Sequence, residues 1–179
     1  LDLIKEVARQ ARCLAYVKGN KVYLKYLSEE PTSVATITDS DIVFGSLKMA
    51  FTETEDVNTK FVAKFYPSYN LEKPIQIILR HNISRFGLVT SEEDYFSMNI
   101  GELVMKSATF WMIRKANTWK LARFKTGLNM LHVELHDAVT LDLNDNHLCN
   151  GPMKGIVRNA IYDSNSNTID FEVWLPVRM

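Results

Sequence analysis

The residues that most resemble metal ligands lie close together in the sequence: His132, Glu134, His136 and Asp137. If residues 129–135 form a strand, alternate side chains share one face, so three of these side chains would converge. A catalytic zinc site needs three protein ligands and one open position. Apolar residues alternate with the polar ones, however, which is equally typical of a half-buried strand that ends in a turn. We prefer this second interpretation and assign no metal ligand.

A second set of oxygen ligands has the spacing of a calcium-binding loop, at Asp142, Asn144 and Asn146. Such a loop also needs glycine at its sixth position and glutamate at its twelfth. This sequence has His147 and Met153 at those positions. We therefore predict a tight turn, which the same residue types favour.

Two short acidic segments, residues 38–41 (TDSD) and 53–56 (ETED), offer paired carboxylates for acid–base catalysis. One carboxyl group of such a pair must lie in an apolar or like-charged environment. Both segments consist instead of turn-forming residues, so we expect solvated loops. The sequence also lacks a phosphate-binding loop, a GxSxG elbow and a dinucleotide fingerprint. We assign no catalytic or cofactor-binding residue, and we predict that the protein is not an enzyme.

The two cysteines, Cys13 and Cys149, are far apart in the sequence and outside any ligand-like spacing. A disulfide between them and two separate thiols both fit this spacing, and we favour two buried thiols in a reducing compartment. Cys13 has only Arg12 as a basic neighbour, and Cys149 stands in a predicted loop. Neither position predicts a nucleophile.

Cations and aromatic residues gather between positions 111 and 125, a composition that can serve nucleic acid. The members are Arg114, Lys115, Lys120, Arg123, Lys125, Trp111, Trp119 and Phe124. Cations at a helix end also suit the helix dipole, and their stems cover apolar surface, which is the account we prefer. The whole chain has 21 Lys and Arg against 21 Asp and Glu. Without a positive excess, we do not expect nucleic acid as a main partner.

The longest predicted element is an amphipathic helix over about residues 91–116. Thr90 or Ser91 can cap it, and Glu93 or Asp94 follows three residues later, as in a capping box. Apolar residues then recur with helical spacing as far as Trp111. A second, short helix is predicted at the N-terminus, where apolar residues recur from Leu3 and the pattern closes near residues 14–16.

Most other segments alternate apolar and polar residues with a period of two, which predicts strands. These strands cover residues 15–18, 21–27, 48–51, 57–65, 75–79, 119–125, 129–135, 138–143, 155–162 and 168–175. The fold class is therefore α+β and strand-dominated, with antiparallel β-barrel or sandwich subdomains around one long helix. We expect one domain at residues 1–27, a helix plus a hairpin, and a second at residues 34–179 that holds the central helix.

No run of 18 or more apolar residues predicts a membrane span, and the charged N-terminus does not fit a signal peptide. The chain begins at Leu1, already inside a helical pattern. We therefore expect it to be a piece of a longer polypeptide.

Three stretches of the sequence together resemble the tail-hub and tail-tip proteins of bacteriophages and prophages, whose hub domains are related to the spike-bearing proteins of contractile injection systems. They are IKEVARQARCLAYVKGNKVYLKYL, ITDSDIVFGSLKMAFTETEDVNTKFVAKFYPSY and LVMKSATFWMIRKANTWKLARFKTGLNMLHVELHDAVTLDL. The resemblance is one of pattern and order over most of the chain, without a diagnostic short motif.

This resemblance implies small β-barrel domains that assemble into a trimer or other ring continuing the tail tube. The expected role is structural, in the virion tail after assembly in the bacterial cytoplasm, with other tail, baseplate, spike or fibre proteins as partners. The polar strand faces at Lys60 and Lys64, or at His132 and Glu134, would then line a lumen or a subunit contact. Short strands need closure or a partner to hide their edges, which a ring provides.

Two hypotheses from other classes remain open. The first is an enzyme domain carried on a tail protein, such as a cell-wall hydrolase, in which His132 and His136 would be the residues to test. The second is a carbohydrate- or protein-binding β-module with Trp119, Trp174 and Tyr162 as exposed aromatic contacts.

Overall fold

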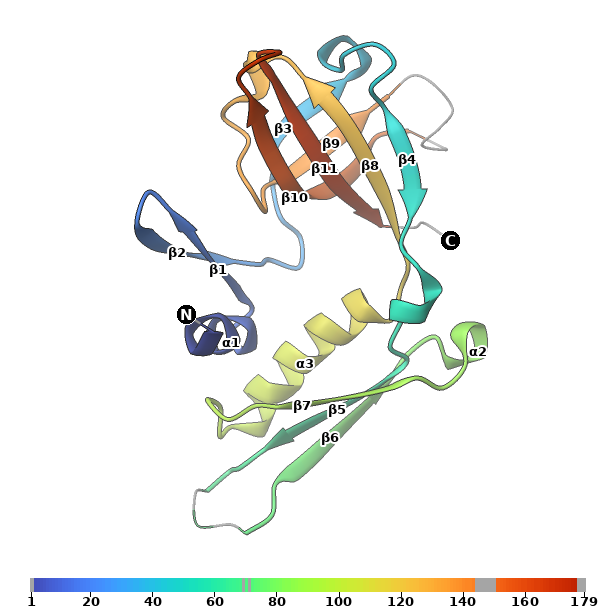
Figure 1. Cartoon of the computed structure of the whole chain (residues 1–179). Helices are drawn as coiled ribbons and strands as arrows, with labels where there is room; N and C mark the ends of the chain where they lie inside the picture. The colour runs from blue at the N-terminus through green and yellow to red at the C-terminus, as the bar shows by residue number, and fades with distance from the viewer. Residues whose placement is uncertain (1, 69, 71, 144–150, 177–179) are drawn as a thin grey trace. The chain divides into compact units, whose positions relative to one another are not determined.

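The computed structural model describes residues 2–68, 70, 72–143 and 151–176 (Figure 1). The chain forms two compact units that interleave along the sequence. Unit 1 consists of Leu1–Glu29 and Thr54–Asn117, and unit 2 of Glu30–Glu53 and Thr118–Met179. The predicted domains at residues 1–27 and 34–179 stay a prediction.

Unit 1 is built on a three-stranded sheet with the order β6-β5-β7. Its elements after the N-terminal segment are η2 (Thr54–Asp56), β5 (Lys60–Phe65), β6 (Ile75–Arg80), α2 (Ile83–Phe86), β7 (Thr90–Asp94) and α3 (Gly101–Lys115). Strand β5 pairs antiparallel with β6 and parallel with β7. Helix α3 lies along one face of this sheet (Figure 1).

The core of unit 1 lies between α3 and β5. Alternate residues of β5 face the helix, so Phe61 and Phe65 are buried against Val104 and Met112. Tyr95, just after β7, is fully buried in the same cluster. Helix α3 therefore covers one face of this sheet and leaves the other face uncovered by a helix.

The N-terminal segment of unit 1 contains α1 (Asp2–Gln10) and a two-stranded ribbon of β1 (Cys13–Lys18) and β2 (Lys21–Tyr26). This confirms a short N-terminal helix and a hairpin at Gly19-Asn20, although the helix ends earlier than the predicted residues 14–16. Arg12 has a φ of 59°, in the left-handed region, and the chain reverses there.

The central helix begins at Gly101, not near residue 91, so the predicted N-terminus of this helix was wrong. Residues 90–94, expected to be its cap, form β7 instead. Backbone pairing with β5 holds them extended, and Glu93 forms ion pairs with Arg9 and Lys115. Tertiary contacts therefore override a local capping signal.

Unit 2 is a six-stranded sheet with the order β3-β9-β10-β11-β8-β4. Its strands are β3 (Ser33–Thr38), β4 (Lys48–Phe51), β8 (Trp119–Thr126), β9 (Ala138–Asp142), β10 (Met153–Asp163) and β11 (Thr168–Pro176). Two short 3-10 helices accompany them, η1 (Asp39–Asp41) and η3 (Leu128–Met130). The sheet curls around its apolar face, so that Ile37 of edge strand β3 shares one core with Phe124 of β8 (Figure 1).

The predicted strand at residues 129–135 was wrong. Residues 128–130 form η3, and turns and irregular segments follow as far as residue 137. Strand β9 begins at the next residue. Met130 and Val133 are buried in the unit 2 core, which explains the apolar residues of the predicted pattern.

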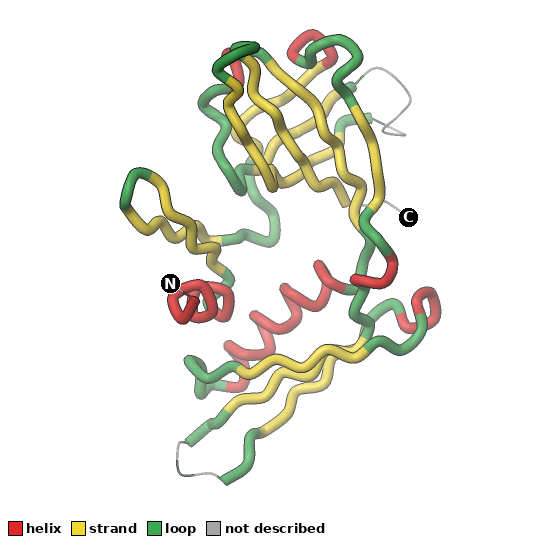
Figure 2. The backbone as a smooth tube through the Cα atoms, in the orientation of Figure 1, coloured by secondary structure: helices red, strands yellow, loops and turns green. Residues whose placement is uncertain are grey.

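The fold class is confirmed: the described chain is α+β and strand-dominated, with sandwich-like sheets and a short N-terminal helix (Figure 2). The sheets are mixed rather than purely antiparallel, because β3 pairs parallel with β9 and β5 with β7. The described six-stranded sheet is not a closed barrel, because β3 and β4 are its two edges, so the sandwich alternative is the one that fits.

Candidate assembly surfaces

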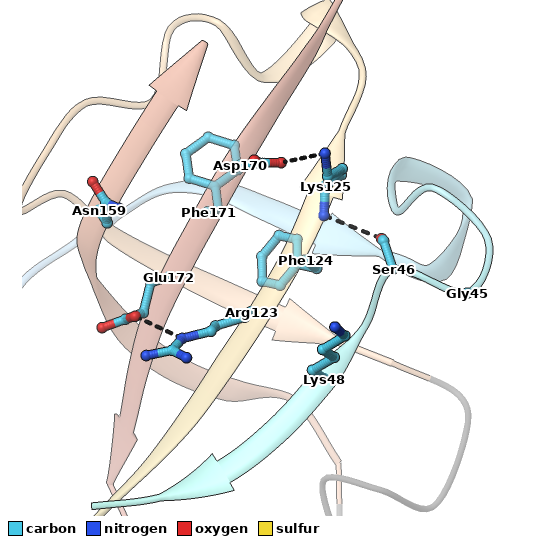
Figure 3. Close-up of a pocket in the computed structure, with 10 residues that line it drawn as sticks. All are labelled: Gly45, Ser46, Lys48, Arg123, Phe124, Lys125, Asn159, Asp170, Phe171 and Glu172. Atoms are coloured by element: carbon cyan, nitrogen blue, oxygen red, sulfur yellow. Dashed lines mark hydrogen bonds and ion pairs between the residues drawn. The ribbon is translucent and has the colours of Figure 1, made fainter. Parts of the chain in front are cut away.

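A groove of about 530 Å³ lies on the outer face of β8 and β11 (Figure 3). The strand register sets Arg123 opposite Glu172 and Lys125 opposite Asp170. The Nε of Arg123 donates to a Glu172 oxygen at 2.8 Å, and the Nζ of Lys125 lies 3.3 Å from an Asp170 oxygen. Phe124, between the two cations, is buried in the core. Strict alternation along β8 therefore places a row of ion pairs on the outer surface.

The acids of this groove are engaged rather than poised for catalysis. The indole Nε1 of Trp174 donates to Glu172 at 3.0 Å, and this bond, together with Arg123, holds the pKa of the Glu172 carboxyl below its usual value. A general acid would need the opposite shift. Lys48 also lines the groove, and no ion pair joins it to a described residue. The groove thus carries one uncompensated positive charge.

A rigid turn forms one wall of the groove and displays an aromatic ring. The Val43 N–H donates to the Lys125 carbonyl at 2.8 Å, and both the N–H and the hydroxyl of Ser46 donate to the Val43 carbonyl. The Ser46 hydroxyl also accepts from the Lys125 N–H at 3.1 Å. Gly45 has a φ of 74°, as the third residue of a type II turn requires. Phe44 precedes it and is fully exposed, at 103%.

An apolar hollow of about 650 Å³ lies on the other side of the same turn. Its apolar lining comes from Ile42, Val43, Phe44, Leu47, Met49 and Leu143. Gly45 lines both the hollow and the charged groove, so the turn separates the two. We call the turn, the hollow and Lys48 together the Phe44 surface.

The N-terminal segment exposes several large apolar side chains. On α1 they are Leu3 (66%), Ile4 (46%) and Val7 (39%), and on the ribbon Val17 (55%), Val22 (50%), Leu24 (63%) and Tyr26 (60%). The register places Val17 opposite Val22, Ala15 opposite Leu24 and Cys13 opposite Tyr26. The ribbon face that these three pairs form therefore carries no charged side chain. We call these seven exposed residues the N-terminal apolar surface.

Side chains from α3 and from the segment after β7 hold α1 in place. The carbonyls of Arg9 and Gln10, at the end of α1, accept from Trp111 Nε1 at 2.9 Å and Ser107 Oγ at 2.7 Å. The buried Gln10 amide donates to the Asp94 carbonyl, and its oxygen accepts from the N–H and hydroxyl of Ser97. Polar contacts thus fix α1, while its apolar stripe remains exposed.

The face of the unit 1 sheet that points away from α3 carries charged side chains beside the apolar pair Val62 and Ile78. Lys60 and Lys64 alternate with Phe61 and so point away from α3. Lys64 forms an ion pair with Glu92 of β7. The prediction that this face lines a lumen or a subunit contact stays a prediction.

The predicted histidine and acid cluster does not form a shared strand face. His132 Nδ1 lies 3.2 Å from the Asn129 carbonyl, and the Asp137 carboxylate accepts the Glu134 N–H at 2.7 Å. His136 has a φ of 64° within the turn. Within residues 2–68, 70, 72–143 and 151–176, no three His, Cys, Asp or Glu side chains are grouped to hold a metal. The calcium-like positions Asn144, Asn146 and His147 lie outside the described residues.

The two acidic segments are turns, as expected. In residues 38–41, the Asp41 carboxylate accepts from the N–H of Thr38 at 2.9 Å and from its hydroxyl at 2.8 Å. These bonds lower the pKa of Asp41. Residues 54–56 form η2. The Asp41 carboxyl group is therefore stabilised in its charged form, which a general acid would not be.

The predicted basic-aromatic residues divide between the two units and are engaged within each. In unit 1 the Arg114 guanidinium lies 3.4 Å from the Phe110 ring centre, and burial lowers its pKa to about 10. In unit 2 the Trp119 and Trp174 rings are 6.2 Å apart, and Arg158 stacks 4.6 Å from the Trp174 centre.

The remaining candidate residues have local partners or lie beyond the description. The Tyr162 hydroxyl donates to Asn167 at 2.9 Å. Cys13 is half-buried, and its thiol lies 3.5 Å from the Ala11 carbonyl. Cys149 lies outside the described residues, so the question of a disulfide stays a prediction.

Sequence patterns did not indicate Phe44 or Gln10. Phe44 stands in VFGS, where only the glycine signals a turn, and nothing in the sequence says that the aromatic side chain is exposed. Gln10 falls among charged residues of an amphipathic helix, yet it is fully buried. The exposure of Phe44 and the burial of Gln10 both depend on which distant segments pack nearby.

No protein-family model matches this chain, and no curated protein matches it in sequence. Its fold does match solved structures of tail proteins. The tail protein of Neisseria meningitidis MC58 matches with a TM-score of 0.59 at 8% identity, covering 98% of this chain and 54% of that one. The prophage tail protein gp18 of Listeria monocytogenes EGD-e gives 0.55 at 9% identity, over 97% and 51%. A chain of the native gene transfer agent virion gives 0.58 at 10% identity, over 87% and 34%.

The chain thus shares the fold of part of these tail and virion proteins, and it spans about a third to a half of their lengths. Identities this low establish the fold alone. No helix in the described ranges is both long and apolar enough to cross a membrane.

Proposed function

We propose that this chain is a structural component of a phage-type tail hub or tip, which forms a trimer or other ring and contacts tail-tube and spike or fibre proteins. The shared fold supports the tail role, because the similar structures are those of tail and virion proteins. In this proposal the chain catalyses no reaction, and its surfaces serve assembly in the virion tail.

The observation that carries the proposal is the N-terminal apolar surface. Four large apolar side chains of a ten-residue ribbon segment, from Val17 to Tyr26, are at least half exposed. A two-stranded ribbon is marginal in water unless another surface covers it. Exposed apolar patches of this kind mark protein contacts. A second copy that covers the ribbon would supply the missing burial.

Sedimentation velocity over a range of protein concentrations tests this proposal with a matched pair of variants. Leu24→Ser removes a leucine of the ribbon, and Leu131→Ser removes one of unit 2 with the same 63% exposure. We expect the unmodified chain and Leu131→Ser to form a trimer or larger ring, and Leu24→Ser to shift toward monomer. A chain that stays monomeric at high concentration contradicts the proposal, as does equal assembly of both variants.

A further inference from the structure

Strand β6 forms an open border of the unit 1 sheet (Figure 1). Within the described residues it pairs with β5 on one side, and no strand pairs with its other side. Two of its isoleucines are about half exposed, Ile75 at 48% and Ile78 at 49%. An unpaired strand edge with exposed apolar side chains is a template for pairing with a strand of another chain.

The backbone hydrogen bonds show which groups of β6 point to its open side. The Lys60 N–H donates to the Val89 carbonyl, just before β7, so the even-numbered residues of β5 bond toward β7. The odd-numbered residues of β5 therefore bond toward β6, where they stand opposite odd-numbered residues. The backbone N–H and C=O groups of Gln76, Ile78 and Arg80 thus point to the open side.

Each of the other strands that border a described sheet carries a feature that discourages pairing. Strand β7 has three acids, β1 and β2 carry lysines, β4 has only four residues and includes Lys48, and the register of β3 shifts along β9. Charges, short length and irregular register protect natural sheet edges. Strand β6 has a regular register and no charge from Ile75 to Leu79. The described strand that best matches the open side of β6 is therefore β6 of a second copy.

Self-pairing of β6 is most complete with Ile78 on a two-fold axis. In this antiparallel register Ile78 lies opposite its own copy, Ile77 lies opposite Leu79, and Gln76 lies opposite Arg80. The Gln76 amide oxygen can accept from the Arg80 guanidinium. Apolar residues are thus opposite apolar ones, and no like charges are directly opposite each other.

The other registers lose part of these contacts. Opposite residues of paired strands share one face of the sheet, so a residue must lie on the axis. With Ile77 on the axis, Arg80 would lie opposite Pro74, which has no N–H to donate. With Leu79 on the axis, Arg80 would lie opposite the apolar Ile78, and with Arg80 on the axis, two guanidinium groups would be opposite each other.

We propose that two copies of the chain pair through β6, antiparallel about a two-fold axis at Ile78, so that their unit 1 sheets become one continuous sheet. Val62 lies opposite Ile78 within each copy, so the four side chains form one apolar row on the face away from α3. The contact is isologous, because both copies use the same strand. It uses neither the ribbon nor α1 and is separate from the contact of the proposed function.

Disulfide trapping tests this contact in the full chain with Cys13→Ser and Cys149→Ser, which remove the natural thiols. In the proposed register the two Cα atoms at position 78 lie about 5.5 Å apart, within the range of a disulfide. The two Cα atoms at position 75 lie about 20 Å apart along the strands. Ile75→Cys is therefore the matched control for Ile78→Cys, since the two isoleucines are equally exposed on the same strand.

With oxidised glutathione, we expect most Ile78→Cys chains to become linked in pairs on a non-reducing gel and Ile75→Cys chains to stay single. Equal linkage of the two variants, or no linkage at position 78, overturns the inference. Leu24→Ser added to Ile78→Cys should leave the linkage unchanged, because the ribbon takes no part, and loss of linkage there also overturns it.

The same measurements separate this inference from the proposed function. If Ile78→Cys chains link but the unmodified chain forms no ring in sedimentation velocity, the inference stands and the proposed function fails. If the ring forms but nothing links at position 78, the inference fails and the proposed function stands.

Discussion

Glu172 shows how single side chains set the charge of the outer groove. It accepts hydrogen bonds from Trp174 and Arg123, and its neighbours on β11 alternate between core and surface. Its carboxylate compensates the charge of Arg123, so Lys48 is the groove cation that has no ion pair with a described residue.

When Glu172 is replaced by Gln, the free energy of unfolding should fall less steeply as the pH is lowered into the acidic range. The pKa of Glu172 in the folded chain is held below its usual 4.5, mainly by the Trp174 bond and then by Arg123. Its contribution to the free energy of unfolding is therefore fully present above that value and is lost as the pH falls through the lower pKa of the folded chain. Urea unfolding between about pH 3 and pH 7 measures this, with Glu53→Gln on an exposed turn as the control. Identical pH profiles for Glu172→Gln and the unmodified chain would refute the account.

Gln10 should be the most sensitive polar residue of the N-terminal segment. Replacing it with Leu removes its hydrogen bonds to the Asp94 carbonyl and the Ser97 N–H, which are partly buried. We expect a loss of about 1–2 kcal/mol in the free energy of unfolding, because each such bond contributes about 0.5–1.5 kcal/mol. Gln76→Leu on the exposed face of β6 is the control. Similar urea midpoints for the two variants would show that these bonds contribute little.

At the residue scale, the sequence predicted mainly those features that depend on the local residue types. The turn character of residues 38–41 follows from Thr, Asp and Ser side chains that bond to their own backbone. The exposure of Phe44 does not, because it depends on which segments pack nearby. His132 and Glu134 appeared to alternate on a strand, but the burial of Met130 and Val133 fits a 3-10 turn equally well.

Among the elements, strand β10 carries the tightest packing constraint. A Cβ built at Gly155 would lie 2.6 Å from Val173 Cγ1 and Leu175 Cδ2 and 2.8 Å from the Trp174 carbonyl oxygen. The glycine therefore permits the close approach of β10 to β11 on which the unit 2 sheet depends.

Gly155→Ala should destabilise unit 2 by about 1–3 kcal/mol, the usual cost of overpacking a core. Gly127→Ala is the matched control, because its Cβ would meet only the flexible Asn129 side chain, at 3.3 Å. Thermal unfolding followed by circular dichroism compares the two. If both alanines shift the midpoint equally, the proposed close packing of β10 on β11 is wrong.

The sequence predicted strands and hairpins more reliably than it predicted helix ends. The terminal hairpin of β10 and β11 follows from strict alternation on both sides of a polar turn. The start of α3 does not, since residues 90–94 carry a good capping signal but pair with β5. Parallel pairing joins segments far apart in the chain, and local patterns contain no information about it.

For the whole molecule, the proposed function depends on apolar side chains that a single copy leaves exposed. The tail-like pattern in the sequence agrees with the fold of tail and virion proteins, although only part of each is matched. The N-terminal apolar surface exposes large side chains at its helix and its ribbon. In the proposed function, a second copy of the chain covers them.

Electron microscopy of the purified assembly tests the central claim most directly. Particles of the full chain at high concentration should appear as closed rings of uniform size with a central opening. In a Leu24→Ser preparation, these rings should be rare. Single unassociated chains, or irregular aggregates without a closed ring, would contradict the account.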